Sequence, residues 1–431
     1  MKKHPKANKS TSRVLGVRIN QVEQLLAMFI GSKLPADVCL TQWMRQNRKA
    51  GSRDRSEVAN AFFDILRNLR LYNHLSSSGF GPETRRLAIL GLFASKGFSA
   101  IANSLKPEES MWLDSINKTS PNYYSPSIRF SFPDWAYKNI KRIDDPESLM
   151  MALNQEASLD LRVNTLKSDR KTVLETLSQP EFSVYKPVAG VYSPWSIKLI
   201  GRPPVNQWEL FKKGVIEVQD EGSQVLSALL APRRGEMIID YCAGAGGKTL
   251  AIGAMMRSTG RLYAFDISAR RLSRARPRIA RSGLSNVVSV VIQENNDKRV
   301  QRLYGKADRV LVDAPCTGFG TLRRNPDLKW RISDNDLKNL VNQQANILDQ
   351  AAMCVKKGGR LVYATCSIFS LENELQIDGF LKRNKEFRLL PAGTILKDVC
   401  PSINLNGPYL QLRPDTHGTD GFFAAALERI N

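Results

Sequence analysis

Two cysteines in the sequence stand where a thiol could react. Asp313-Ala-Pro-Cys316 ends one apolar, strand-like run, and Thr365-Cys366-Ser367 ends another. Both cysteines lie beside polar residues and glycines, whereas Cys39, Cys354 and Cys400 are better explained as small buried hydrophobes. The pattern therefore predicts a site that contains two thiols.

A thiolate suits the modification of a pyrimidine base. Carbon 5 of cytosine is too weak a nucleophile to attack a methyl sulfonium, but adding a thiolate to C6 places electron density on C5. An acid near N3 must assist this addition, and the proton on C5 must leave afterwards. Asp313 is suitably placed to hydrogen-bond the N3/N4 edge of the base. The residues alone leave open whether Cys316 or Cys366 attacks.

Two other reactions on bases fit the sequence less well. A zinc deaminase requires His-x-Glu and Pro-Cys-x-x-Cys, and Phe319 stands where the second cysteine would be. A methyltransferase acting on an amino group requires an aromatic residue after Asp-x-Pro, where Cys316 stands. No Cys-x-x-Cys pair occurs and the chain has only 3 histidines, so we expect no metal.

A glycine-rich loop indicates a cofactor site. Asp240-Tyr-Cys-Ala-Gly-Ala-Gly-Gly-Lys-Thr249 follows an apolar run and opens a helical one, so its glycines allow close approach of a ligand. A phosphate-binding loop would need glycine in place of Cys242, and a dinucleotide fingerprint would need Gly or Ala in place of Thr249. Asp266 ends the next strand and could hold a ribose hydroxyl pair. The loop and the acid together favour a nucleoside cofactor, of which S-adenosylmethionine (SAM) is one.

The elements that carry these motifs predict an α/β domain over 221–431. Apolar runs predict strands at 237–241, 262–265, 287–292, 310–312, 361–364 and 422–427, and helices are expected at about 247–258, 268–282, 336–356 and 370–383. This alternation predicts a mostly parallel sheet covered on both faces. In such sheets ligands bind at the carboxyl ends of the strands, where the motifs lie.

Two smaller domains are expected before it. Helical periodicity dominates 1–118, which also carries a basic N-terminal tail. A Pro- and Ser-rich linker then leads into a small α+β module within 119–220. In this module we expect a strand at 159–163, a helix at 168–178 and short strands near 182–185, 196–200 and 215–218.

The charge of the chain favours a polyanionic partner. The net charge is +22 over 431 residues, residues 1–60 hold 12 Lys/Arg against 4 acids, and 261–281 holds seven arginines against one acid. Nucleic acid is favoured over a membrane, because no apolar run of membrane-spanning length or secretion signal occurs. Six cysteines without framework spacing suggest a reducing compartment, so we expect the protein in the cytoplasm.

At this point the motifs resemble those of a known family. The chain resembles the Sun/RsmB-type RNA (cytosine-5) methyltransferases, which have a Rossmann-like class I SAM methyltransferase domain. The resemblance is carried by Val218–Gln224, Cys242–Lys248, Asp313–Gly320, Arg323–Trp330, Tyr363–Ser367, Glu372–Glu374 and 417–423. It implies SAM as cofactor and RNA as partner, with the small-subunit ribosomal RNA as substrate.

The resemblance also implies a role for each site residue. Cys366 would attack C6, and Cys316 would assist product release from the covalent adduct. The SAM site would be lined by Cys242, Ala243, Gly244, Ala245, Gly246, Gly247, Lys248, Asp266 and Asp313. Two departures stand out: Gly244 and Ala245 replace the family's Ala-Pro, and Asn295 occupies the place of an aspartate that faces the adenine.

The resemblance extends to the N-terminal part of the chain. The first helices resemble a NusB-like RNA-binding domain, and the middle module resembles the family's RNA-recognition-like segment, whose Lys and Arg would contact phosphate. We expect a monomer. The alternatives are a tRNA substrate, a DNA cytosine methyltransferase that attacks with Cys316, and an RNA-binding assembly factor without activity.

Overall fold

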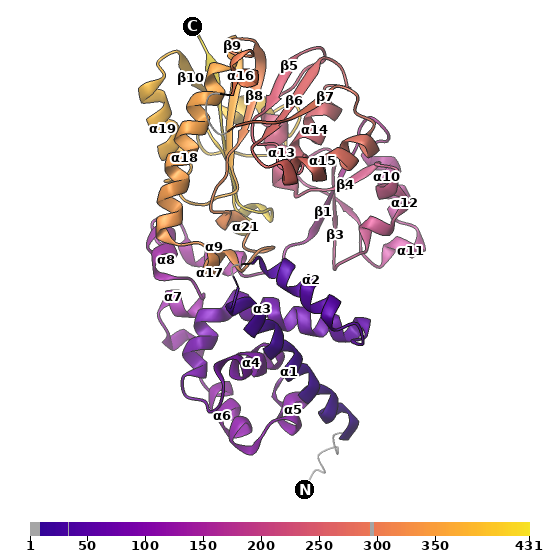
Figure 1. The fold of residues 1–431 in the computed structure, drawn as a ribbon, viewed down its shortest axis with the longest axis vertical. Helices are drawn as coiled ribbons and strands as arrows, with labels where there is room; N and C mark the ends of the chain where they lie inside the picture. Colours follow the sequence, from indigo (N-terminus) through magenta and orange to yellow (C-terminus); the bar gives the residue numbers. More distant parts are fainter. Residues whose placement is uncertain (1–8, 33, 294–296) are drawn as a thin grey trace. The chain divides into compact units, whose positions relative to one another are not determined.

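The chain divides into two compact units in a computed structural model that describes residues 9–32, 34–293 and 297–431. One unit comprises 1–155 and Leu322–Ser333, and the other comprises Glu156–Thr321 and Asp334–Asn431 (Figure 1). The first unit continues past residue 118, where we expected a boundary, because helices between 126 and 153 belong to it.

The first unit is built from helices, as its periodicity predicted. Its longer helices are α1 (Lys9–Ile30), α2 (Ala36–Gln46), α3 (Ser52–Ser76), α4 (Glu83–Lys96), α6 (Pro107–Asn117), α8 (Asp134–Ile140) and α9 (Pro146–Leu153); α5 (Phe98–Ile101) and α7 (Pro126–Arg129) are single turns. Their apolar stripes form one core, in which Phe29 and Phe62 meet edge to face at 5.7 Å between ring centroids.

A segment from far along the chain completes this unit. Helix α17 (Leu328–Arg331) lies in Leu322–Ser333, and its Trp330 Nε1 donates to the Leu66 carbonyl at 2.7 Å. The Asp327 carboxylate accepts from the backbone N–H of Ala36 at 3.2 Å. The motif Arg323–Trp330 therefore serves to hold the helical unit together.

The second unit begins with a four-stranded sheet of order β2-β3-β1-β4. The strands are β1 (Leu159–Val163), β2 (Val188–Ala189), β3 (Ser196–Leu199) and β4 (Ile216–Val218), accompanied by α10 (Arg170–Leu177), α11 (Pro180–Ser183) and α12 (Glu209–Lys212). The strand expected near 182–185 was wrong. Pro180 occupies the first turn of α11, where a fixed φ suits a helix start.

The larger sheet follows the order β10-β12-β9-β8-β5-β6-β7, with β11 paired to β12. Its strands are β5 (Met237–Asp240), β6 (Arg261–Asp266), β7 (Val287–Val291), β8 (Ala307–Asp313), β9 (Val355–Thr365), β10 (Phe387–Leu390), β11 (Leu410–Leu412) and β12 (Phe422–Arg429). The run from β9 to β7 is parallel as predicted, whereas β12 pairs antiparallel with β9 and β10.

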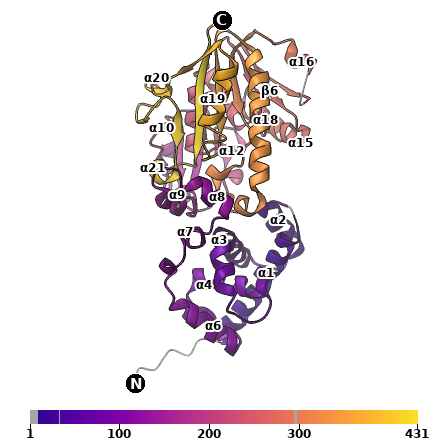
Figure 2. The same ribbon diagram turned by 90° about the vertical axis from the view of Figure 1, so that its left-hand side faces the viewer.

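Helices cover both faces of this sheet, as predicted. Helices α18 (Asp334–Met353) and α19 (Glu374–Arg383) lie side by side on one face (Figure 2). The other face packs against α13 (Glu221–Leu229), α14 (Gly247–Met255) and α20 (Ala392–Leu396), and α15 (Ala269–Ser282) follows β6. The remaining helical turns are α16 (Lys298–Gln301) and α21 (Pro414–His417). The carboxyl ends of β5, β6, β8 and β9 thus meet at one edge of the sheet.

Candidate active site

The glycine loop turns between β5 and α14 with two left-handed residues. Gly244 has φ 55° and Gly246 has φ 82°, and a side chain on Gly246 would approach Ala275 Cβ to 3.0 Å. The φ of Gly244 favours glycine at this departure from the family pattern, and open space lies where its side chain would be. The loop therefore leaves room for a ligand beside its backbone.

The acid after β6 fixes this loop from the side. The Asp266 carboxylate accepts from the N–H of Gly244 at 2.9 Å and from the N–H of Ser268 at 2.7 Å. Asp240 lies beneath the loop, where its Oδ2 accepts from the Thr249 hydroxyl at 2.6 Å. Burial raises the pKa of Asp240 to about 7, and the charges of Asp313 and Asp266 add to that rise. Oδ1 of Asp240 is buried without a hydrogen-bond partner among the described residues.

Cys242 is an unreactive member of the loop. Burial raises the pKa of its thiol well above the ordinary value, and the carboxylates of Asp313, Asp240 and Asp266 raise it further. A thiol that keeps its proton is a poor nucleophile, so Cys242 can line a ligand but not attack it.

Lys248 connects the loop to the end of β8. Its Nζ donates to Asp313 Oδ2 at 2.7 Å and lies 6.0 Å from the centroid of the Phe422 ring. Burial alone would lower the pKa of Lys248, but the charge of Asp313 and the hydrogen bond outweigh it and leave the pKa raised. The ammonium group thus remains charged and holds the Asp313 carboxylate at the site.

The two candidate cysteines meet. Sγ of Cys316 lies 3.3 Å from Sγ of Cys366, although 50 residues separate them in the chain, and both thiols are half-buried. The pKa of Cys316 is raised well above its ordinary value by the hydrogen bond with Cys366, by burial and by the charges of Cys366 and Glu372. The two thiols are therefore close enough to exchange a proton, and either sulfur can be the donor.

One buried carboxylate links the loops that carry the two cysteines. Glu372 accepts from the N–H of Thr317 at 2.9 Å and from its hydroxyl at 2.5 Å, and it also accepts from the hydroxyl of Ser367. Gln344 Nε2 donates to the same carboxylate at 2.9 Å and to the Pro315 carbonyl at 2.9 Å. The residues that follow each cysteine are thus bound to one side chain.

Sequence reasoning assigned no role to Glu372 or Gln344. Glu372 stood in a recognised motif, but two of its partners, Gln344 and Thr317, lie 28 and 55 residues away in the chain. The sequence offered one signal, because Glu372 is an acidic residue shortly after the Thr365-Cys366-Ser367 motif. Asn295, expected to face the adenine, lies outside the described residues.

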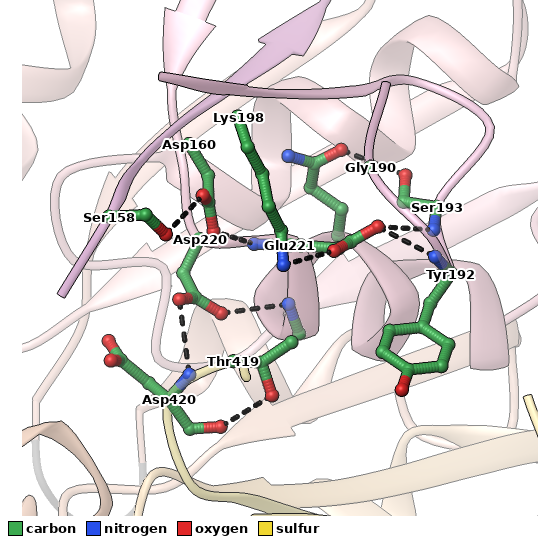
Figure 3. A network of polar contacts seen from close by, with 12 residues as sticks. Ser158, Asp160, Gly190, Tyr192, Ser193, Lys198, Asp220, Glu221, Thr419 and Asp420 are labelled. Atoms are coloured by element: carbon green, nitrogen blue, oxygen red, sulfur yellow. Dashed lines mark hydrogen bonds and ion pairs between the residues drawn. The ribbon is translucent and has the colours of Figure 1, made fainter. Parts of the chain in front are cut away.

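The motif Val218–Gln224 joins the four-stranded sheet to the larger sheet. Glu221 at the start of α13 is buried and accepts from the N–H groups of Tyr192 and Ser193 at 2.7 and 3.0 Å, while Lys198 Nζ lies 3.0 Å from it. Asp220 accepts from the N–H of Asp420 at 3.2 Å (Figure 3). These carboxylates hold the module, α13 and the turn before β12 in one network.

The residues fit SAM. The positive φ values of Gly244 and Gly246 leave the backbone open to a ligand, Asp266 presents a carboxylate beside it, and the buried Asp240 oxygen has acceptor capacity. Among the described residues no group of three or more His, Cys, Asp or Glu could hold a metal ion. No helix in the described ranges has the length and apolarity required to cross a membrane.

The sheet order, the glycine loop and the acid after β6 together define a class I SAM-dependent methyltransferase. Residues 227–428 match the family model described as 16S rRNA methyltransferase RsmB/F, and residues 132–206 match the ferredoxin-like domain of RsmF/B-like methyltransferases. The chain belongs to this RsmB/F methyltransferase family, which confirms the predicted family and fold class and SAM as the cofactor.

Relatives and solved structures agree. The chain is 35% identical over 307 residues to "Probable ribosomal RNA small subunit methyltransferase B" of Synechocystis sp., covering 70% of this chain and 67% of that protein. It is 34% identical over 303 residues to the Escherichia coli "Ribosomal RNA small subunit methyltransferase B", covering 69% of this chain and 66% of the relative. The chain thus spans about two thirds of these relatives.

Among solved structures, PH0851 is similar with a TM-score of 0.74 and 26% identity, covering 99% of this chain and 100% of that chain. A methyltransferase homologue from Pyrococcus horikoshii is similar with a TM-score of 0.60 and 26% identity, covering 72% of this chain and all of that chain. Both likenesses support the methyltransferase fold.

Proposed function

We propose that this protein transfers a methyl group from SAM to carbon 5 of a cytosine in the RNA of the small ribosomal subunit. The observation that carries the proposal is the 3.3 Å approach of the Cys316 and Cys366 sulfurs beside Asp313. Methylation of an amino group or of a ribose needs no thiol pair, whereas methylation of C5 needs one thiol to form an adduct and a second group to help resolve it.

The contact between the two sulfurs supports an order of events. Cys366 is the nucleophile that bonds to C6, and Cys316, whose pKa is raised by the hydrogen bond with Cys366 and by burial, is the thiol that exchanges a proton with it. The Asp313 carboxylate, held by Lys248, accepts a hydrogen bond from the N4 amino group of the base and so keeps the ring against Cys366. After methylation the C5 proton passes to a water molecule, the electrons of that C–H bond restore the double bond between C5 and C6, and the electrons of the C6–S bond leave with the Cys366 sulfur. Cys316 protonates this sulfur and takes back a proton from the water.

When bound, SAM supplies the electrophilic methyl group. The residues of this chain orient the reaction around it: the Cys242–Lys248 loop and Asp266 hold the cofactor, and Lys248 holds Asp313. The ion pair between Lys248 and Asp313, at 2.7 Å, couples the cofactor loop to the loop that bears Cys316. Binding of the cofactor and placement of the cytosine would therefore both depend on the ion pair between Lys248 and Asp313.

The RNA substrate is supported by charge and by the relatives. A net charge of +22 suits a polyanion, and the relatives at 34–35% identity are named as small-subunit rRNA methyltransferases. A ribosomal RNA substrate in turn implies action in the cytoplasm.

The test uses two serine variants of the full chain with radiolabelled SAM and protein-free small-subunit rRNA. Cys366→Ser should abolish turnover and form no adduct, whereas Cys316→Ser should accumulate a covalent protein–RNA adduct on a denaturing gel. Cys354→Ala, at a buried cysteine outside the site, serves as a control with full activity. An active Cys366→Ser together with an inactive, adduct-free Cys316→Ser would overturn the assignment.

The substrate class is tested separately. Bisulfite sequencing of total RNA from a deletion strain should show one lost 5-methylcytosine in the small-subunit rRNA. Loss of a tRNA site instead would replace the rRNA substrate but retain the chemistry, and loss of no site would contradict both.

A further inference from the structure

Helix α15 carries a concentration of arginines that the site does not use. Its sequence from Ala269 to Ser282 contains six arginines and no acid. Leu272 and Ala275 are buried on its inner face. At 100° per residue, five of the six arginines fall within one sector of about 100° that flanks that face. This arginine stripe comprises Arg270, Arg271, Arg274, Arg278 and Arg281.

The two ends of the stripe differ in their contacts. The end with Arg278 and Arg281 is the fixed end, and the end with Arg270 and Arg274 is the free end. Arg278 and Arg281 form ion pairs with the buried Glu217 of β4, Arg278 Nη1 donates to the Ala245 carbonyl at 2.7 Å, and the Arg281 guanidinium lies 4.0 Å from the Phe211 ring centroid. Arg270 and Arg274 are exposed and form no ion pair among the described residues. The helix, labelled in Figure 1, is therefore held against the small sheet and the cofactor loop at one end. Exposed cations lie at its other end.

The stripe opposes the stability of the helix that bears it. Four arginine pairs three or four positions apart repel one another: 270 with 274, 271 with 274, 274 with 278, and 278 with 281. Arg270 and Arg271 also stand in the first turn, where the helix dipole disfavours cations and no acid is present. The free end of the stripe therefore gains nothing from the fold, which indicates a ligand.

We propose that the arginine stripe of α15 binds the phosphate backbone of the RNA that flanks the target cytosine. A guanidinium group can donate two parallel N–H hydrogen bonds to phosphate oxygens, which favours arginine over lysine at such a surface. The helix begins three residues after Asp266, and its fixed end contacts the cofactor loop through Ala245. A strand of RNA on this stripe would therefore pass beside the site. The inference rests on the proposed RNA substrate.

The surface continues into the small sheet. Lys167 Nζ donates to the Arg281 carbonyl at 2.6 Å and to the Lys213 carbonyl at 2.7 Å, which ties the end of α15 to two loops of that module. Basic residues of the module thus meet the fixed end of the stripe. The stripe would place RNA by its backbone and leave base recognition to other residues.

The test is the double variant Arg270→Gln/Arg274→Gln, examined by direct binding of protein-free small-subunit rRNA over a salt series. Two lost phosphate contacts should reduce the slope of log K against log salt by about 1.4–1.8 and weaken binding roughly tenfold or more. SAM affinity and kcat at saturating RNA should not change. The melting temperature should stay equal or rise, because repulsion is relieved. Arg270→Lys/Arg274→Lys should keep the slope.

A matched control removes two exposed cations that lie beside β10, at the opposite edge of the sheet: Lys382→Gln/Lys385→Gln. This control should retain wild-type RNA binding. An unchanged slope in the arginine variant, or an equal loss in the lysine control, would overturn the proposal. Because binding is measured without turnover, failure of the stripe is distinguishable from failure of the methylation chemistry, which the cysteine variants test.

Discussion

Two lysines in this molecule, the half-buried Lys248 and the buried Lys329, have opposite surroundings. Lys248, in the cofactor loop, donates to the Asp313 carboxylate at 2.7 Å. Lys329, in the segment that completes the helical unit, donates to the carbonyls of Arg67 and Ser131 at 2.9 and 3.0 Å and lies 4.1 Å from the Phe132 ring centroid. The pKa of Lys248 is raised by its carboxylate partner, whereas burial lowers the pKa of Lys329 well below its ordinary value.

Under the proposed function, the difference separates a charge that serves the reaction from one that serves assembly. Lys248 has an anionic partner, the Asp313 carboxylate, so its charge is compensated and fixed. Lys329 has only neutral acceptors, so its Nζ joins three backbone or side-chain oxygens but has no anion to compensate its charge. We therefore expect the same substitution to have different effects at the two lysines. At Lys248 it should affect activity, and at Lys329 it should affect stability.

The largest effect is expected from Lys248→Met, which keeps the length of the side chain but removes its charge. Asp313 would lose its partner and its fixed position, so kcat/KM should fall by roughly 100-fold or more. Methyl transfer from labelled SAM measures this change. Lys329→Met is the matched control and should retain kcat within a few-fold, and equal losses in both variants would break the distinction between the two lysines.

The sequence predicted where the motifs of this site lie but not the contacts between them. The loop Cys242–Lys248 and the two cysteines were placed correctly at the carboxyl ends of strands, because long apolar runs define the parallel strands before them. The ion pair between Lys248 and Asp313 was not predicted, because 65 residues separate the partners and only the sheet order brings β5 and β8 together. The roles assigned to the site residues stay predictions.

The fold shows the same limit. Strands β10 and β11 were not predicted, because each is short and is stabilised by pairing with β12 instead of by its own pattern. The motif Arg323–Trp330 looked like part of the catalytic domain, since it lies between two catalytic motifs in the chain. Its partners, such as Leu66 and Ala36, are hundreds of residues away, and only the structure shows that it belongs to the helical unit.

Glu372 is a buried carboxylate that, unlike Asp313, accepts hydrogen bonds from neutral donors. Glu372→Gln keeps the shape but places an amide N–H₂ where Thr317, Ser367 and Gln344 all donate. The cysteine loops should lose their fixed spacing, so kcat should fall roughly tenfold with little change in the KM for SAM, and the unfolding free energy should fall by about 1–3 kcal/mol.

Glu374→Gln, two residues further along, is the control for this variant because Glu374 contacts Gln411 and not the cysteine loops. The charge of Glu372 also raises the pKa of Cys316, so alkylation of Cys316 should begin at a lower pH in Glu372→Gln. An unchanged alkylation profile together with an unchanged kcat would show that Glu372 only supports the fold.

Lys329→Met should affect stability and leave the chemistry intact. The substitution leaves the carbonyls of Arg67 and Ser131 without their donor, which costs about 1–3 kcal/mol of unfolding free energy. Chemical denaturation measures this loss, and SAM binding by titration calorimetry should not change. A variant as stable as the wild type would mean that the three hydrogen bonds contribute nothing net to the helical unit.

The smallest effect is the pH dependence that separates the two lysines. A Lys329 with a lowered pKa binds fewer protons in the folded state than in the unfolded state, so its contribution to stability rises with pH up to its ordinary pKa of 10.5. Lys248, with a raised pKa, contributes fully below 10.5 and loses its contribution only above it. The stability difference between wild type and Lys329→Met should therefore grow as pH rises toward 10.5, while the difference for Lys248→Met stays flat over that range. Unfolding free energies of the three proteins at several pH values measure both trends, and a flat difference for Lys329→Met would mean that Lys329 stays charged in the folded protein.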